Sequence, residues 1–144
     1  MRIAIMDRNH EVAYALKEEL ERRQVSAIVV QSYSVALRLL KGRPRPAALF
    51  VGEFVGDRPG VDLLAEIERT PGVVDLPVFT MLSHPRSLIA SALRSGGVHV
   101  LVPPLLVVEI AEVIATALEA RSWTSAQVAQ SDDDDELRDH GVLT

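Results

Sequence analysis

The sequence lacks cysteine throughout its 144 residues, which excludes a disulfide framework and a thiolate site. It also lacks an apolar run long enough to span a membrane; the longest, residues 98–108, contains His99 and two prolines. No charged segment followed by an apolar one precedes the strand-like residues 1–5, so no signal peptide is expected. These absences favour a cytoplasmic protein.

Net charge is missing from most of the chain. Residues 122–144 contain six acids and one base, a net charge of −5, and the whole chain is also −5, so residues 1–121 balance with 14 bases and 14 acids. A domain without net positive charge lacks the electrostatic attraction that binds the phosphates of a nucleic acid. Nucleic-acid binding by this body is therefore not expected.

The pattern of residues predicts one domain over residues 1–121, followed by a flexible acidic tail over 122–144. The tail is typical of a soluble extension or a linker. Docking on a basic partner and folding back on the domain are the other interpretations. At 48% hydrophobic residues, the chain as a whole is globular rather than disordered.

Five repeats of a strand followed by a helix organise residues 1–121. Asn9 is expected to cap the first helix and Ser34 the second, which stops at Gly42, while Gly60 opens the third. The expected strands are 2–6, 27–30, 47–51, 77–82 and 98–102, and the last two helices are 86–95 and 105–121.

These strands are apolar without polar alternation, which indicates burial on both faces. The prediction is an α/β fold: a three-layer α/β/α sandwich with a five-stranded parallel sheet in the order 2-1-3-4-5 and five helices. In such sheets the functional crevice lies outside the carboxyl ends of the strands. Candidate site residues are therefore sought where the strands end.

The spacing of these strand ends resembles the receiver domain of bacterial response regulators, the phosphorylated partners of histidine kinases in two-component systems. The resemblance covers residues 1–121. It implies that the phosphoacceptor aspartate falls on Gly52, which ends the run 47–51 and precedes Gly60 by eight residues. It also implies magnesium-binding acids after the first strand, where this chain has Asp7 and then Arg8.

The remaining receiver positions also differ from the family pattern. The switch hydroxyl falls on Leu82, with Ser83 next, the lysine falls on Pro103, and the switch aromatic falls on Val100. Acyl-phosphate chemistry needs a carboxylate nucleophile and a divalent cation. One carboxylate beside Arg8 is a poor magnesium site, because hard cations prefer several oxygen ligands.

The prediction is a degenerate receiver that is not an enzyme, binds no metal or cofactor, and acts as a phosphorylation-independent protein-interaction module. One alternative is small-ligand binding in the vacated pocket around Asp7, Arg8, Gly52 and Ser83. Another is phosphotransfer to Glu53 or Asp57. A metal site of Asp7, His10 and His84 has no ligand-spacing motif, so none is predicted.

The last helix is expected to be apolar on more than one face. Ile110, Ile114, Ala117 and Leu118 form the face expected to pack on the sheet. By the resemblance, receivers pair through the fourth helix, fifth strand and fifth helix, which predicts a homodimer. The alternative is that this helix simply lies deeper in the core. The interface candidates are Val100, Leu106, Val108 and Val113.

Overall fold

The computed structural model describes residues 2–73, 75–82 and 97–120. The chain divides into two compact units, Met1–Ala111 and Glu112–Thr144. Within the described residues no helix is both long enough and apolar enough to cross a membrane. The predicted helix 86–95 and the predicted tail 122–144 lie outside these residues.

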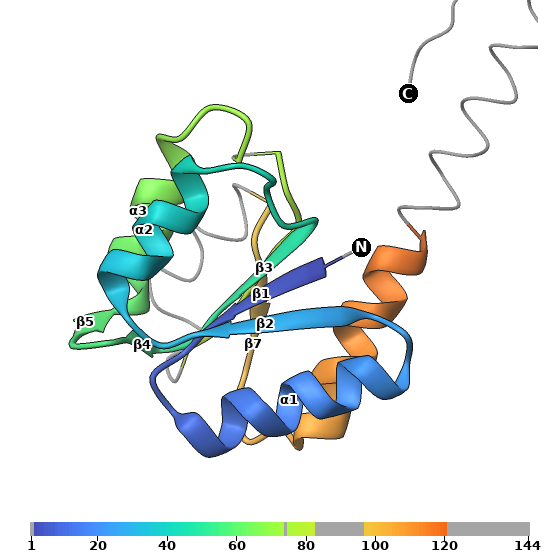
Figure 1. Ribbon diagram of the computed structural model, residues 1–144. Helices are drawn as coiled ribbons and strands as arrows, with labels where there is room; N and C mark the ends of the chain where they lie inside the picture. The colour runs from blue at the N-terminus through green and yellow to red at the C-terminus, as the bar shows by residue number, and fades with distance from the viewer. Residues whose placement is uncertain (1, 74, 83–96, 121–144) are drawn as a thin grey trace, which may run out of the picture. The chain divides into compact units, whose positions relative to one another are not determined.

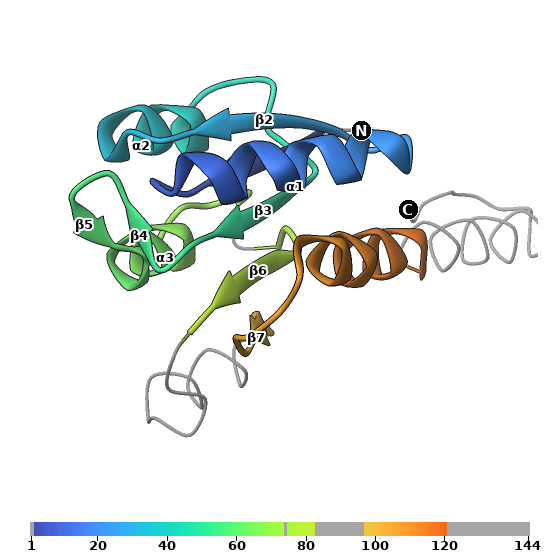
Figure 2. The same ribbon diagram turned by 90° about the horizontal axis from the view of Figure 1, so that it is seen from below.

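A five-stranded parallel sheet forms the centre of the first unit (Figures 1 and 2). Its strand order is β2-β1-β3-β6-β7. Two further strands, β4 and β5, form a separate hairpin, so this is the predicted order 2-1-3-4-5 of the five expected strands, and the prediction is confirmed. The strands are β1 (Arg2–Met6), β2 (Ser26–Val30), β3 (Ala48–Val51), β6 (Val78–Met81) and β7 (His99–Leu101).

Helices cover both faces of this sheet. α1 (His10–Arg22) lies on one face, and α2 (Tyr33–Lys41) lies with α3 (Gly60–Glu68) on the other (Figure 1). The side chains of β1 alternate between the two layers: Ala4 and Met6 join the core cluster that contains the buried residues of α2 and α3. Ile3 and Ile5, which alternate with them along β1, are also fully buried. Because both faces of the strand are buried, its apolar residues do not alternate with polar ones.

The first two helices begin at side-chain caps. Asn9 caps α1 as predicted, because its side-chain oxygen accepts the Val12 N–H at 3.1 Å. The predicted cap at Ser34 is wrong: Ser32 has the extended backbone of a cap and accepts the Val35 N–H at 3.4 Å. The helix starts earlier because Tyr33 is buried as its first residue.

A short hairpin between β3 and α3 was not predicted. β4 (Phe54–Val55) pairs antiparallel with β5 (Arg58–Pro59) across a two-residue turn. Gly56 adopts φ +63° in this turn, a conformation that glycine adopts without steric cost. The hairpin fixes the path of the chain between Gly52, the candidate phosphoacceptor position, and α3.

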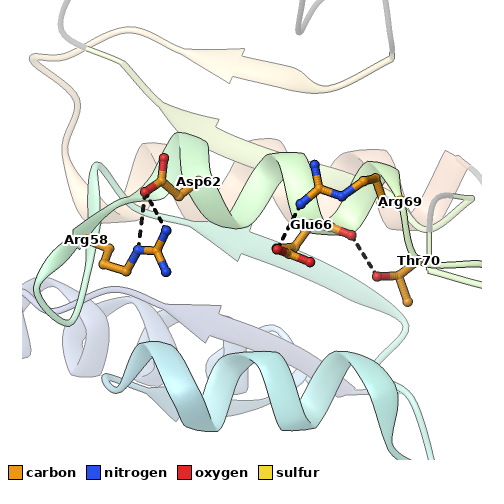
Figure 3. Close-up of polar contacts among 5 residues, drawn as sticks. All are labelled: Arg58, Asp62, Glu66, Arg69 and Thr70. Atoms are coloured by element: carbon orange, nitrogen blue, oxygen red, sulfur yellow. Dashed lines mark hydrogen bonds and ion pairs between the residues drawn. The ribbon is translucent and has the colours of Figure 1, made fainter.

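α3 combines buried contacts with a polar outer face (Figure 3). Arg58 pairs with Asp62 at 3.1 Å, and Arg69 pairs with Glu66 at 2.8 Å. The Thr70 hydroxyl donates to the Glu66 carbonyl at 2.7 Å. Exposed pairs contribute at most about 1 kcal/mol each, so burial of the apolar residues of α3 contributes more to holding it in place.

The last described helix spans residues 107–120. It starts two residues later than predicted, because the Glu109 carboxylate accepts the Leu106 N–H at 2.8 Å, one half of a capping box. In the first unit Ile110 is buried. In the second, Ile114 and Leu118 are buried while Val113 is exposed. Ile110, Ile114 and Leu118 of the predicted face are thus buried, and Ala117 is half-buried.

Candidate functional site

The carboxyl ends of β1 and β3 place Asp7 beside Gly52. The two strands are parallel neighbours with Met6 opposite Val51, and the Gly52 N–H continues the ladder by donating to the Met6 carbonyl at 2.9 Å. Gly52, rather than Glu53, therefore stands where the strand ends. The one-residue slip that would bring Glu53 to this position does not occur.

The Asp7 carboxyl group fills the space above Gly52. A β-carbon on Gly52 would lie 2.5 Å from Asp7 Oδ2 and 2.8 Å from Oδ1, closer than real β-carbons approach other atoms. Asp7 Oδ1 is held in this orientation by the Asn9 N–H, which donates to it at 2.9 Å. In the present arrangement, then, a side chain at position 52 has no room unless Asp7 moves.

Gly60 is needed for a related reason. A β-carbon at this position would collide with the Gly52 carbonyl oxygen and would lie 3.1 Å from Val51 Cγ1. The Gly60 N–H donates to the Glu53 carbonyl at 2.7 Å. The first turn of α3 therefore packs directly on the end of β3, which requires a residue without a side chain.

The Asp7 carboxyl group is partly desolvated. Burial raises its pKa above the ordinary value of 3.8. The Asn9 N–H and the nearby Arg8 charge lower the pKa, and the Glu53 charge raises it, but burial is the largest cause. Asp7 therefore lacks full compensation for its negative charge, and within the described part of the chain it forms no ion pair.

Arg8 contacts Phe54 and Gln31 and does not form an ion pair with Asp7. Its N–H donates to the Phe54 carbonyl at 3.0 Å, and its carbonyl accepts from Gln31 Nε2 at 3.3 Å. Its guanidinium carbon lies 4.3 Å from the centre of the Phe54 ring, a cation–π contact. Arg8 thus links the loops that follow β1, β2 and β3.

These loops surround a pocket of about 270 Å³ at the ends of β1, β3 and β6. The structure brings together three of the predicted site residues here, Asp7, Arg8 and Gly52. Glu53, from the predicted alternatives, also lines the pocket, whereas Asp57 lies exposed in the hairpin turn and does not. The other lining residues are Asn9, Val12, Phe54 and Met81.

Of the remaining predicted positions, Leu82 and Pro103 do not line the pocket. Leu82 is half-buried, and its N–H donates to the Leu101 carbonyl at 3.1 Å. Pro103 is also half-buried, and Ser83 lies outside the described residues. The predicted positions of the switch hydroxyl and the lysine therefore contribute no polar side chain to the pocket in the part of the chain that the structure describes.

Sequence reasoning missed Thr80, whose hydroxyl lies close to the site. This side chain is 1% exposed, and it donates to the Val51 carbonyl at 2.7 Å. The signal was a lone hydroxyl in an otherwise apolar strand. Phe54 and Gln31 were also missed, because their roles depend on contacts with Arg8 that the sequence does not reveal.

The donor set does not fit the magnesium ion that receivers hold. Asp7 offers one carboxylate, and Oδ1 of this group already accepts the Asn9 N–H. Across residues 2–73, 75–82 and 97–120, no group of three acids or histidines is placed to hold a metal ion. His10 instead contacts Gln31 at 3.4 Å and packs at a tilt against the Tyr14 ring, and His84 lies outside the described residues.

The predicted interface residues differ in exposure. Leu106 is 67% exposed, Val108 42% and Val113 39%, whereas Val100 is half-buried in β7. Val102, just after β7, is also exposed at 39%. The first unit therefore exposes three large apolar side chains, Val102, Leu106 and Val108, within seven residues of its chain.

Solved structures of receiver domains share this fold. A CheY-like receiver domain from Methanospirillum hungatei is 16% identical with a TM-score of 0.69, covering 85% of this chain and 97% of the other. A two-component response regulator from Clostridium difficile is 23% identical with a TM-score of 0.65, covering 83% and 93%. A streptococcal protein from a family of redox sensors evolved from two-component response regulators is 16% identical with a TM-score of 0.70.

This chain covers 54% of that streptococcal protein, while 88% of this chain is covered. No family model matches the sequence, and no curated protein matches it. The structural similarities define the class of the fold: it is the fold of response regulator receiver domains.

Proposed function

We propose that this chain is an atypical receiver that transmits signals through protein contacts without being phosphorylated. The observation that carries the proposal is the Asp7 carboxyl group lying in the space of a side chain at position 52. Gly52 offers no nucleophile, and any acid placed there would compete with Asp7 for the same volume. The position thus opposes acyl-phosphate formation both chemically and sterically.

The charges around Gly52 also favour this proposal. A phosphoryl group in transfer needs positive charge close to its oxygens. Asp7 and Glu53 are negative, and the one guanidinium among the described lining residues, that of Arg8, lies over the Phe54 ring. Such a site would repel an incoming phosphodonor rather than stabilise it, and we therefore propose that the chain is not an enzyme.

Contacts between the loops support a fixed conformation. Arg8 is bonded to Phe54 and Gln31, and the Arg58 guanidinium lies 4.3 Å from the centre of the Tyr33 ring. These contacts join the β4–β5 hairpin to the start of α2 and to the end of β1. Without a covalent input, the population of signalling states would be set by a partner.

The proposed partner is a bacterial signalling protein, and a second copy of the chain is proposed to bind through Leu106 and Val108. Adjacent exposed apolar residues favour an interface. The neutral body makes nucleic acid an unsuitable partner, and we place the protein in the cytoplasm. The streptococcal redox sensors offer a precedent for a receiver descendant with a different input, although this chain has no cysteine for thiol chemistry.

The deciding experiment is incubation with acetyl phosphate and magnesium, followed by intact-mass measurement. An active receiver, treated in parallel, verifies the phosphodonor. The expected result is an unchanged mass for this protein and an added phosphoryl group on the active receiver. An adduct on this protein overturns the proposal, and Glu53→Gln and Asp57→Asn variants then show which of the two alternative acceptors carries it.

A further inference from the structure

The pocket above Gly52 combines negative charge with apolar walls. Its lining residues include two acids, Asp7 and Glu53, and one arginine, Arg8. The apolar side chains Val12, Phe54 and Met81 line the same volume of about 270 Å³. Such a volume admits a short alkyl chain with a charged head, but not a large cofactor.

The charge of Asp7 favours a cationic head. Its carboxyl group accepts the Asn9 N–H at 2.9 Å but forms no ion pair within the described residues. Burial is the largest influence on its pKa and outweighs the nearby Arg8 charge. A positive group brought next to this carboxylate would offset the desolvation and form a charge-assisted hydrogen bond.

The guanidinium of Arg8 does not supply this cation. It lies over the Phe54 ring, and the Arg8 backbone is anchored on both sides by hydrogen bonds to Phe54 and Gln31. A ligand with a cationic head also needs an apolar surface for its alkyl stem. Val12 and Met81 supply this surface. The absence of a side chain at Gly52 leaves the carboxylate open to the pocket.

We propose that this pocket binds a primary alkylammonium group, with the ammonium beside Asp7 and the alkyl chain along Val12, Phe54 and Met81. The inference rests on the proposed function, because a phosphorylated site would place its negative phosphoryl group in the same space. The chemistry occurs in free amines and in lysine side chains of partner proteins. The experiment below tests the shared chemistry first and then the source.

The test is an NMR titration of the full chain with n-butylammonium chloride at constant ionic strength. The expected result is a saturable shift of the backbone amides of Asn9, Glu53 and Phe54. Methylammonium should bind several-fold more weakly for each methylene lost, because each buried methylene contributes to affinity. Sodium butanoate, which has the same chain length and the opposite charge, should not bind.

Variants separate this site from nonspecific binding. Asp7→Asn keeps an oxygen to accept the Asn9 N–H and removes the charge, so affinity for n-butylammonium should fall at least about tenfold. Gly52→Ala adds a methyl group against Asp7 and should also weaken binding. Asp62→Asn removes a carboxylate that does not line the pocket and should leave affinity unchanged.

Titration with Nα-acetyl-lysine methylamide distinguishes the two sources of the ammonium group, a free amine and a lysine side chain of a partner protein. Binding as tight as that of n-butylammonium supports a lysine side chain of a partner, and weaker binding supports a free amine. The proposal is overturned if n-butylammonium produces no saturable shift, if butanoate binds equally well, or if Asp7→Asn leaves the affinity unchanged. Such an outcome leaves the phosphodonor result untouched, because that measurement detects a mass adduct and this one detects reversible binding.

Discussion

Asp7 and Gly52 form a complementary pair, in which the carboxyl group of one residue occupies the side-chain space of the other. A β-carbon at position 52 would approach Asp7 Oδ2 to 2.5 Å. The glycine is thus part of how Asp7 is accommodated, and not only the loss of an acid. Restoring an acid at position 52 would therefore not by itself restore a receiver site.

The variant Gly52→Asp tests this pairing. Its side chain must displace Asp7 and places a second carboxylate beside it, so the free energy of unfolding should fall by about 1–3 kcal/mol. Urea denaturation of the variant and the native chain measures the difference.

A double-mutant cycle provides the control. In the Asp7→Ala background the space above Gly52 is empty, so Gly52→Asp should cost less than it does in the native chain. The expected coupling between the two positions is roughly 0.5–3 kcal/mol. Purely additive effects would show that the two side chains do not compete for the same space.

The raised pKa of Asp7 predicts a pH-dependent effect on stability. Because burial raises the pKa above 3.8, the folded chain holds this proton more tightly than the unfolded chain does. Between the unfolded and folded pKa values the folded state binds more protons, so the contribution of Asp7 to stability falls as pH rises through this window and stays low above it.

Asp7→Asn lacks this dependence. The free energy of unfolding of the variant minus that of the native chain should grow as pH rises from about 4 and should level off once the pH exceeds the raised pKa of Asp7. Urea denaturation across this range measures the difference, and the other carboxyl groups cancel because both proteins contain them. A flat difference would mean that burial does not perturb Asp7.

The positions of the strands and the identity of the residues at their ends could be predicted from the sequence. Short apolar runs punctuated by capping residues and glycines indicate parallel strands, and parallel strands end at one edge of a sheet. Asp7 and Gly52 can therefore be placed side by side from the sequence alone. The β4–β5 hairpin could not be predicted, because its two-residue strands are too short to show an alternation of apolar and polar residues and one of them contains Pro59.

The contacts within the site could not be predicted in this way. The stacking of Arg8 on Phe54 depends on the path of the hairpin, and the bond from Thr80 to Val51 depends on strand register to within one residue. A helix cap was also misplaced by two residues, because Ser32 and Ser34 have the same capping chemistry. Burial of Tyr33, a tertiary effect, decides between them.

Thr80→Val is predicted to destabilise the sheet. The substitution keeps the shape of the side chain and removes the hydroxyl that donates to the Val51 carbonyl. Because this bond is buried, water cannot replace the lost donor, and the expected cost is about 1 kcal/mol or more.

Thr70→Val is a matched control for this substitution. Its hydroxyl also donates to a backbone carbonyl at 2.7 Å, but at a half-buried helix end where water can replace it. Denaturation curves of both variants should therefore show the larger loss for Thr80→Val. Equal losses would indicate that burial does not strengthen the bond to Val51.

The exposed residues at the start of the last helix predict self-association. If Leu106 and Val108 meet a second copy, the double variant Leu106→Glu/Val108→Glu buries two unpaired charges in the interface and should weaken the dimer at least about a hundredfold. Sedimentation equilibrium measures the mass. Val35→Glu is the control, because Val35 on α2 is exposed to a similar extent, 39% against 42% for Val108, and should leave the dimer intact. A native chain that sediments as a monomer, or a double variant that stays dimeric, would contradict the prediction.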